Sequence, residues 1–417
     1  MDGSVTTPQA FDAGALGGIT DILNGVIAAG DLSGAMTLVW RKGAEVRFEA
    51  LGLRDIATKA PMTRDTLFRI ASMTKPVTTV AALMLVEEGK LKLDDPITQW
   101  APEFANMRVL KSATGPVDET YPAPRDITVE DLMTHRSGLA YAFTSVGPIA
   151  HAHQAALGDV LNSDMTADAW MKALGGLPLT YAPGERFHYS HATDVLGFIV
   201  GRVAGMDFRD FLMRRVFGPL GMVDTDFYIP PEKRDRAATV YRINEAANTL
   251  DPVNFARRDA PPSFCGGGGG LVSKIDDYLT FARMLLNQGE VDGVRLLKPQ
   301  TVAAMSTNHL SDAQREHTFM GMPFWVGQGF GLGLSVITDP DKHAWMGAGS
   351  AGSFGWPGAF GTWWQADPAE NLIILYMVQN SMDIAPEAVS RPPSGLRMGA
   401  QMALPMVQKT IYAALGK

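Results

Sequence analysis

Cysteine is nearly absent from this sequence, because Cys265 is the only one among 417 residues. A disulfide within the chain is therefore excluded, which fits a reducing compartment. Residues 1–18 contain neither a basic segment nor an apolar one, so no secretory signal is predicted. The sequence also lacks a long run of uncharged apolar residues, so we expect no membrane span. Together these absences predict a cytoplasmic protein.

Charge of one sign is not concentrated in any part of the chain. The net charge is −8, and the lysines and arginines are dispersed without a basic stripe, which argues against nucleic acid as a partner. Hydrophobic residues make up 46% of the chain and charged residues only 19%, so a large core is expected. The length indicates two or three structural units. No cofactor and no metal site are predicted, and the oligomeric state stays open.

Strand patterns lie near both ends of the chain, and helical patterns lie between them. The predicted strands are 36–40, 46–51, 333–338, 361–368 and 372–378, and the predicted terminal helices are 11–29 and 401–415. The simplest arrangement is an α/β (α+β) fold, with one antiparallel sheet built from both termini and flanked by helices. We predict a sheet domain of residues 1–78 and 266–417 and a mostly helical domain of residues 79–265. The active site is expected at their junction.

The first chemical signal is a serine three residues before a lysine. A short strand at 67–70 leads into a mostly apolar helix, which carries Ser72 and Lys75. Residues three apart share a helix face, so the hydroxyl and the amine can meet. Burial disfavours the ammonium form, so Lys75 could take the proton as Ser72 attacks an acyl carbon. The pair alone also fits an N-cap serine followed by a solvated lysine.

Two further segments bear on the chemistry. Tyr189 lies in a polar turn before a predicted helix and could carry a proton to a leaving group, although an isolated tyrosine is more often part of a core. Gly266 to Gly270 let the backbone approach another group closely. A phosphate loop would have Lys-Ser or Lys-Thr after its last glycine, and Leu271-Val272 stands there instead.

Three motifs occur in an order that resembles a known family. They are Ser-Met-Thr-Lys at 72–75, Tyr-Ser-His at 189–191 and Trp-Pro-Gly at 356–358, supported by ITVEDLMTHRSGL at 127–139 and GGGGGLVSKIDDYLTFARMLL at 266–286. The chain resembles the class C β-lactamases and their esterase relatives, the family VIII carboxylesterases, from Phe11 to Leu415. The resemblance implies a fold like that of β-lactamases and penicillin-binding proteins.

The resemblance also implies roles for particular residues. Ser72 would be the acylated nucleophile, Lys75 would accept its proton, and Tyr189 would hydrogen-bond both and pass a proton to the leaving alcohol. The backbone N–H groups of Ser72 and of Ala359, just after the third motif on an edge strand, would form the oxyanion hole.

The substrate-binding residues implied by the resemblance are His191, Trp356, Gly358 and Phe360. β-Lactamases and cell-wall peptidases have a lysine at the position of Trp356, and its cation binds a substrate carboxylate. An indole offers apolar area and one donor but no full charge. His191 stands where the lactamases have asparagine, and its role is open. We therefore predict a serine carboxylesterase that hydrolyses small neutral esters with short acyl chains through an acyl-enzyme on Ser72.

Three other functions are weighed against this prediction. A β-lactamase or a D-Ala-D-Ala carboxypeptidase of the same fold would use the same serine. A catalytically inactive penicillin-binding-like protein would keep the fold alone, although the Ser, Lys and Tyr set is complete. A Ser-His-Asp hydrolase usually has a Gly-x-Ser-x-Gly elbow, which this sequence lacks.

Overall fold

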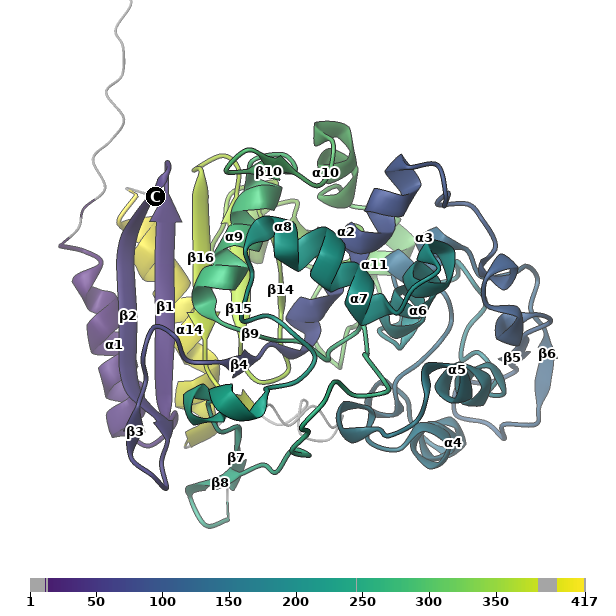
Figure 1. Ribbon diagram of the computed structural model, residues 1–417, viewed down its shortest axis with the longest axis horizontal. Coiled ribbons are helices and arrows are strands. Elements are labelled where there is room, and N and C mark those ends of the chain that lie inside the picture. The colour runs from purple at the N-terminus through teal and green to yellow at the C-terminus, as the bar shows by residue number, and fades with distance from the viewer. Residues whose placement is uncertain (1–11, 13, 245, 382–395, 416–417) are drawn as a thin grey trace, which may run out of the picture.

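The computed structural model describes residues 12, 14–244, 246–381 and 396–415, and a large sheet dominates this part of the chain (Figure 1). Its strands are β1 (Gly34–Arg41), β2 (Ala44–Asp55), β3 (Ala60–Pro61), β12 (Gln328–Phe330), β13 (Ser335–Ile337), β14 (Phe354–Pro357), β15 (Trp363–Asp367) and β16 (Leu372–Met377). Their order is β12-β13-β14-β15-β16-β1-β2-β3, and every neighbouring pair is antiparallel. β16 pairs with β1, so the predicted sheet from both ends of the chain is confirmed.

A tight turn sets the register of the first hairpin. β1 and β2 pair Arg41 with Ala44, which leaves Lys42 and Gly43 as the connection. Both have positive φ, 50° and 92°, as a two-residue hairpin turn with the right twist requires. Glycine adopts this backbone conformation at no steric cost, and Lys42 adopts it as well.

The two faces of the sheet are covered by different helices. In β16, Leu372, Ile374 and Tyr376 pack in a cluster with helices α1 (Gly17–Ala28) and α14 (Leu396–Ala413), the two terminal helices. The alternate residues Ile373, Leu375 and Met377 face the main core with α2 (Thr74–Glu87) and α9 (Ile275–Leu286). A strand buried on both faces reads as a continuous apolar run because its side chains alternate between two cores. Phe11, the predicted start of the first helix, lies outside the described residues.

Helices dominate the middle of the chain, and α3 (Val129–Met133), α4 (Pro148–Leu157), α5 (Ala167–Gly175) and α6 (Ala192–Ala204) gather at the end of the molecule away from α1 (Figure 1). The next two, α7 (Phe208–Leu212) and α8 (Gly218–Leu220), lead back towards α9. One continuous cluster of buried side chains joins Leu38 and Leu375 of the sheet to Trp170 and Leu196 of the helices. The division at residues 78/79 and 265/266 therefore stays a prediction.

Several short elements connect these layers. The 3₁₀ helices are η1 (Ala71–Met73), η2 (Ile97–Gln99), η3 (Pro102–Phe104), η4 (Ala142–Thr144), η5 (Val160–Asn162) and η7 (Pro231–Arg236), η6 (Met213–Phe217) is a π-helix, and the remaining helices are α10 (Pro299–Met305), α11 (Asp312–Arg315) and α12 (Pro340–His343). The short strands are β4 (Phe68–Arg69), β5 (Arg108–Leu110), β6 (Thr120–Pro122), β7 (Tyr241–Asn244), β8 (Thr249–Pro252), β9 (Val272–Ser273), β10 (Glu290–Val291), β11 (Val294–Arg295) and β17 (Asn380–Ser381). Among the described residues, none of the helices combines the length and the apolar composition needed to cross a bilayer.

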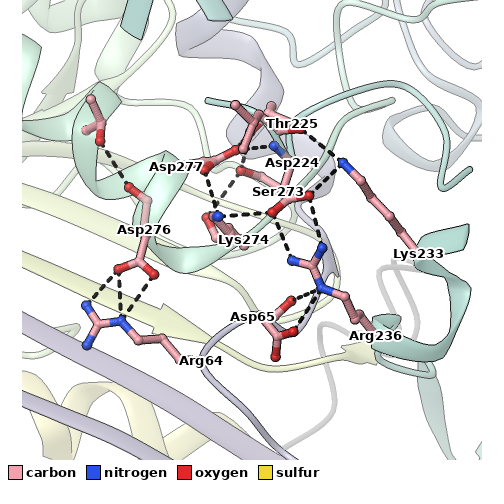
Figure 2. A network of polar contacts seen from close by, with 12 residues as sticks. Arg64, Asp65, Asp224, Thr225, Lys233, Arg236, Ser273, Lys274, Asp276 and Asp277 are labelled. Atoms are coloured by element: carbon pink, nitrogen blue, oxygen red, sulfur yellow. Dashed lines mark hydrogen bonds and ion pairs between the residues drawn. The ribbon is translucent and has the colours of Figure 1, made fainter. Parts of the chain in front are cut away.

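An ionic network ties distant segments together around Asp224 (Figure 2). Its carboxylate, only 7% exposed, lies 2.7 Å from Lys233 Nζ, 2.9 Å from an Arg236 guanidinium nitrogen and 2.9 Å from Lys274 Nζ. Lys233 and Arg236 come from η7, whereas Lys274 directly precedes α9. Arg236, ahead of the two lysines, holds the pKa of Asp224 well below its usual range. The network therefore links the loop after α8 to the helix that covers the sheet.

Replacing this carboxylate is expected to destabilise the fold. Asp224→Asn leaves three cations without their shared anion, and because these cations are partly exposed we expect a loss of about 1–2 kcal/mol. The pKa of Asp224 is lower in the folded than in the unfolded chain, so its contribution is complete above about pH 5, begins to decline near pH 4 and is lost as the pH falls towards the folded value. Urea unfolding at about pH 7 and about pH 3 measures both effects.

The matched control is Asp235→Asn, which changes an exposed carboxylate in η7, next to Arg236. We expect this variant to stay within about 0.5 kcal/mol of the parent. Equal losses for the two variants, or a difference between them that is the same at both pH values, would contradict the role assigned to Asp224.

Candidate active site

Ser72 lies in a strained turn at the entrance to a buried helix. It belongs to the 3₁₀ helix η1, between β4 and α2, whereas Lys75 belongs to α2. The prediction that Ser72 and Lys75 share one regular helix is therefore wrong, because the α-helix begins only at Thr74. Ala71, just before it, has a φ of 44°, a left-handed conformation that costs a residue with a side chain about 1–2 kcal/mol. Strain of this kind persists where surrounding packing holds it, often at functional sites. Here Ala71 packs in a small cluster with Phe360.

Lys75 is fully buried in the first turn of α2, and its amine is surrounded by oxygen atoms. Nζ lies 3.3 Å from Ser72 Oγ, 3.1 Å from Tyr141 Oη and 2.6 Å from the carbonyl oxygen of Gly268. The Gly268 carbonyl can only accept a hydrogen bond, so one N–H is committed there. The amine is therefore fixed in position beside the serine hydroxyl, as predicted from their spacing.

Tyr189 reaches Ser72 from the turn before α6. Its hydroxyl donates to Ser72 Oγ at 2.7 Å and accepts the indole N–H of Trp356 at 3.2 Å. The resemblance implied that Tyr189 also bonds to Lys75, which the structure does not show. Nζ instead lies 4.5 Å from the centre of the Tyr189 ring, a cation–π distance. The hydroxyl that Lys75 contacts is that of Tyr141.

A second group of polar side chains, missed by the sequence analysis, lies behind Lys75. Asp194 of α6 is buried and accepts hydrogen bonds from the backbone N–H of Gly268 at 2.7 Å and from Tyr141 Oη at 3.5 Å. Its other contact is His191 Nδ1, at 3.0 Å. Asp194 is the only acidic residue of α6, and a buried carboxylate requires polar partners. An acidic residue in a mostly apolar predicted helix is therefore the sequence signal that could have identified Asp194.

The electrostatics of this group follow from its burial. Burial lowers the pKa of His191, and the neighbouring Asp194 only partly opposes this shift. Burial also lowers the pKa of His135, whose ring lies 4.7 Å from that of Tyr189, to well below the usual range. Tyr141 has its pKa raised well above the usual range, by burial and then by Asp194. Both imidazoles and the Tyr141 phenol are therefore neutral at pH 7.

The glycine run provides the close backbone approach expected of it. A side chain at Gly268 would come within 2.9 Å of both Asp194 carboxylate oxygens and 2.8 Å of Tyr141 Oη. Gly267 is equally confined, and its carbonyl accepts a hydrogen bond from Thr78 at 2.7 Å. The carbonyl of Gly268 can reach Lys75 only because these positions carry no side chain.

The two backbone amides predicted for the oxyanion hole are both available. Neither the N–H of Ser72 nor that of Ala359 has an acceptor among the described residues, and both residues line the same cavity. Gly358 lets the segment that carries Ala359 approach the one that carries Ser72. A side chain at Gly358 would lie only 2.4 Å from the carbonyl oxygen of Ile70, two residues before Ser72. The sequence predicted an edge strand here, and this prediction is wrong, because β14 lies between β13 and β15. Its pairing with β13 ends at Gly355, so the following residues are free on that side.

The cavity beside Ser72 has a volume of about 810 Å³. Of the predicted substrate-binding residues, His191 lines it. Trp356, Gly358 and Phe360 are not among the described residues of its wall. Trp356 is buried and donates its only N–H to Tyr189, and Phe360 packs against Phe255 with ring centres 5.5 Å apart. Packing around the catalytic groups accounts for these three positions, and their contact with substrate stays a prediction.

Comparison with known proteins identifies the family of this chain. The family model described as Beta-lactamase matches residues 19–392. Protein Rv1367c of Mycobacterium tuberculosis is 51% identical over 395 residues, which cover 94% of this chain and 97% of that protein. Esterase EstB of Burkholderia gladioli is 30% identical over 408 residues, which cover 92% of this chain and 96% of EstB.

A solved structure extends the similarity to three dimensions. EstCE1, described as a hydrolase with promiscuous acyltransferase activity, superposes with a TM-score of 0.79 at 25% identity, covering 97% of this chain and all of that one. The predicted fold, like that of β-lactamases and penicillin-binding proteins, is therefore confirmed. With a family match over most of its length and a serine, a lysine and a tyrosine meeting at one cavity, this chain belongs to the β-lactamase family, in the branch that includes esterases.

Proposed function

We propose that this protein is a serine carboxylesterase that hydrolyses small neutral esters with short acyl chains through an acyl-enzyme on Ser72. The observation that carries the proposal is the position of Ser72 Oγ between two groups that can exchange protons. Lys75 Nζ lies 3.3 Å away on one side and Tyr189 Oη lies 2.7 Å away on the other. The esterase relatives EstB and EstCE1 support the reaction class.

The attack step follows from the hydrogen bonds of Lys75. A neutral amine has two N–H groups, and these can be donated to the Gly268 carbonyl and to Tyr141 Oη. Its lone pair is then directed at the Ser72 hydroxyl and takes the proton as Oγ bonds to the ester carbon. The carbonyl oxygen becomes negative and is stabilised by the amides of Ser72 and Ala359. One such donor contributes roughly 3–4 kcal/mol to the transition state.

Tyr189 serves the second half of the reaction. When the tetrahedral intermediate collapses, the C–O bond to the alcohol breaks and the alkoxide needs a proton. The Tyr189 hydroxyl lies 2.7 Å from Oγ, next to the carbon that the alkoxide leaves, and can deliver the proton. The indole N–H of Trp356 stabilises the phenolic oxygen while its proton is away. The phenolate then recovers a proton from the Lys75 ammonium, which restores both groups. Water repeats the sequence on the acyl-enzyme and releases the acid.

The substrate preference rests on Trp356, a neutral residue at the position where β-lactamases and cell-wall peptidases have a cation. Trp356 is buried behind Tyr189 and is not part of the described cavity wall. A site without that cation favours a neutral group over a carboxylate. The volume of the cavity leaves room for an ester larger than a short-chain one. The proposed chemistry uses no metal or cofactor. That absence and a location in the cytoplasm stay predictions.

Three substrates on one preparation test this proposal. We expect p-nitrophenyl butyrate to be hydrolysed with a kcat/KM at least about 100-fold above those of nitrocefin and a D-Ala-D-Ala peptide, because Trp356 stands at the position of the cation that would bind their carboxylates. Release of p-nitrophenol, opening of the lactam ring and release of D-alanine are the measurements. Faster turnover of nitrocefin or the peptide would establish the lactamase or peptidase alternative instead. Failure to hydrolyse any of the three would favour the inactive binding protein.

A further inference from the structure

Arg69 presents a guanidinium group to the cavity that contains Ser72. It ends β4, three residues before the serine, and both lie on the cavity wall. The side-chain amide of Gln379 clamps its backbone, with bonds of 3.0 Å to the N–H and 3.0 Å to the carbonyl. The guanidinium carbon lies 4.2 Å from the centre of the Phe255 ring. The backbone and one face of the guanidinium are therefore held in place.

The N–H groups of this guanidinium have no acceptor among the described residues. Other arginines on the same wall are satisfied: Arg258 bonds to Asp164 at 2.6 Å and Arg234 to Asp259 at 2.5 Å. Arg54 donates to two backbone carbonyls, and Arg257 is exposed to solvent. Arg69 is partly buried, and burial followed by repulsion from Arg258 lowers its pKa to about 10. It remains a cation at pH 7, and no anion in the described part of the chain compensates the water it has lost.

We propose that Arg69 binds a carboxylate carried by the natural ester substrate, at a point remote from the bond that is cleaved. This inference rests on the proposed esterase function. The planar fork of a guanidinium matches the two oxygens of a carboxylate, and stacking on Phe255 leaves its edge free to donate. Arg69 and Ser72 are three residues apart and line the same cavity, so one substrate can contact both side chains.

The proposed site at Arg69 is distinct from the carboxylate site of β-lactamases and cell-wall peptidases. Those proteins use a lysine in the third motif, at the position of Trp356 in this chain. The third-motif position on β14 holds the buried, neutral Trp356, so it provides no cation for the surroundings of the scissile ester. Arg69 on β4 supplies a cation on the cavity wall itself. A substrate with a neutral reacting ester and a charged far end satisfies both features.

Matched ester pairs test the proposal. The first pair is the p-nitrophenyl half-ester of adipic acid and p-nitrophenyl hexanoate, which share acyl length and differ in a terminal carboxylate. The second is 3-(carboxymethyl)phenyl butyrate and 3-ethylphenyl butyrate, which place the carboxylate on the alcohol. We expect kcat/KM to favour the acid at least tenfold in one pair. If neither pair favours the acid while hexanoate is hydrolysed, this inference is overturned and the esterase function stands. If no member is hydrolysed, the proposed function itself fails.

Variants assign the preference to a residue. Arg69→Met removes the charge at similar length and is expected to abolish the preference, whereas Arg69→Lys keeps the charge, loses the fork and retains part of it. Arg258→Met is the control, a charge removed from the same wall at a residue that has its own protein partners. An equal loss of preference in Arg258→Met would show a general field effect and overturn the assignment. Should Arg69→Met fail to fold, as judged by circular dichroism, the wild-type pairs and Arg69→Lys still decide.

Discussion

Ester hydrolysis by a Ser72→Ala variant is expected to fall by roughly 10⁴-fold or more. The substitution removes the oxygen that forms the acyl-enzyme and leaves Lys75 and Tyr189 without their common partner. The thiol of Cys265 does not take that place, because Cys265 is buried and desolvation raises its pKa to about 12. Hydrolysis of p-nitrophenyl butyrate measures the loss, and mass spectrometry after a fluorophosphonate probe measures where the chain is labelled.

Ser163→Ala is the matched control for this variant. Ser163 lies on the wall of the same cavity, but its hydroxyl only accepts a hydrogen bond from the backbone N–H of Met165, at 3.3 Å. We expect its rate to stay within about twofold of the parent, as for most substitutions away from a special feature. Labelling of a serine other than Ser72, or full turnover by Ser72→Ala, would remove Ser72 from the proposed mechanism.

The second large effect is expected for Tyr189→Phe, with a loss in kcat of about 10²–10⁴. The phenyl ring keeps the packing against His135 and Trp356, so the cause is the loss of the proton carrier. The loss should depend on the leaving group. An alkoxide needs a proton to leave and p-nitrophenolate does not, so ethyl butyrate should lose more activity than p-nitrophenyl butyrate.

Tyr141→Phe separates the two tyrosines that lie near Lys75. Tyr141 contacts Lys75 and Asp194 but has no contact with Ser72 among the described residues, so it is expected to orient the amine. We predict a loss below about tenfold, equal for the two esters, because no step of proton delivery to the alcohol passes through it. Equal leaving-group dependence in both variants would contradict the role proposed for Tyr189.

The local elements were largely readable from the sequence because short-range chemistry specifies them. Thr128 caps α3 with a reciprocal bond to Asp131, as its spacing indicated. The apolar run in β16 reads as a strand because both of its faces are buried. The helix α2 reads as buried because it is apolar on all sides, and its residues from Thr74 to Leu85 are buried.

The sequence by itself therefore determined the order of strands and helices, the family, and the serine, lysine and tyrosine that meet beside the cavity. Only the tertiary structure decided which oxygen atoms surround the lysine amine, that Trp356 supports Tyr189, and that Arg69 faces the cavity without an anion from the residues that the structure describes. Periodicity and motif spacing report interactions between residues close in the chain. The partners of Lys75 at Tyr141 and Gly268 are 66 and 193 residues away, and such contacts are set by the packing of the whole core.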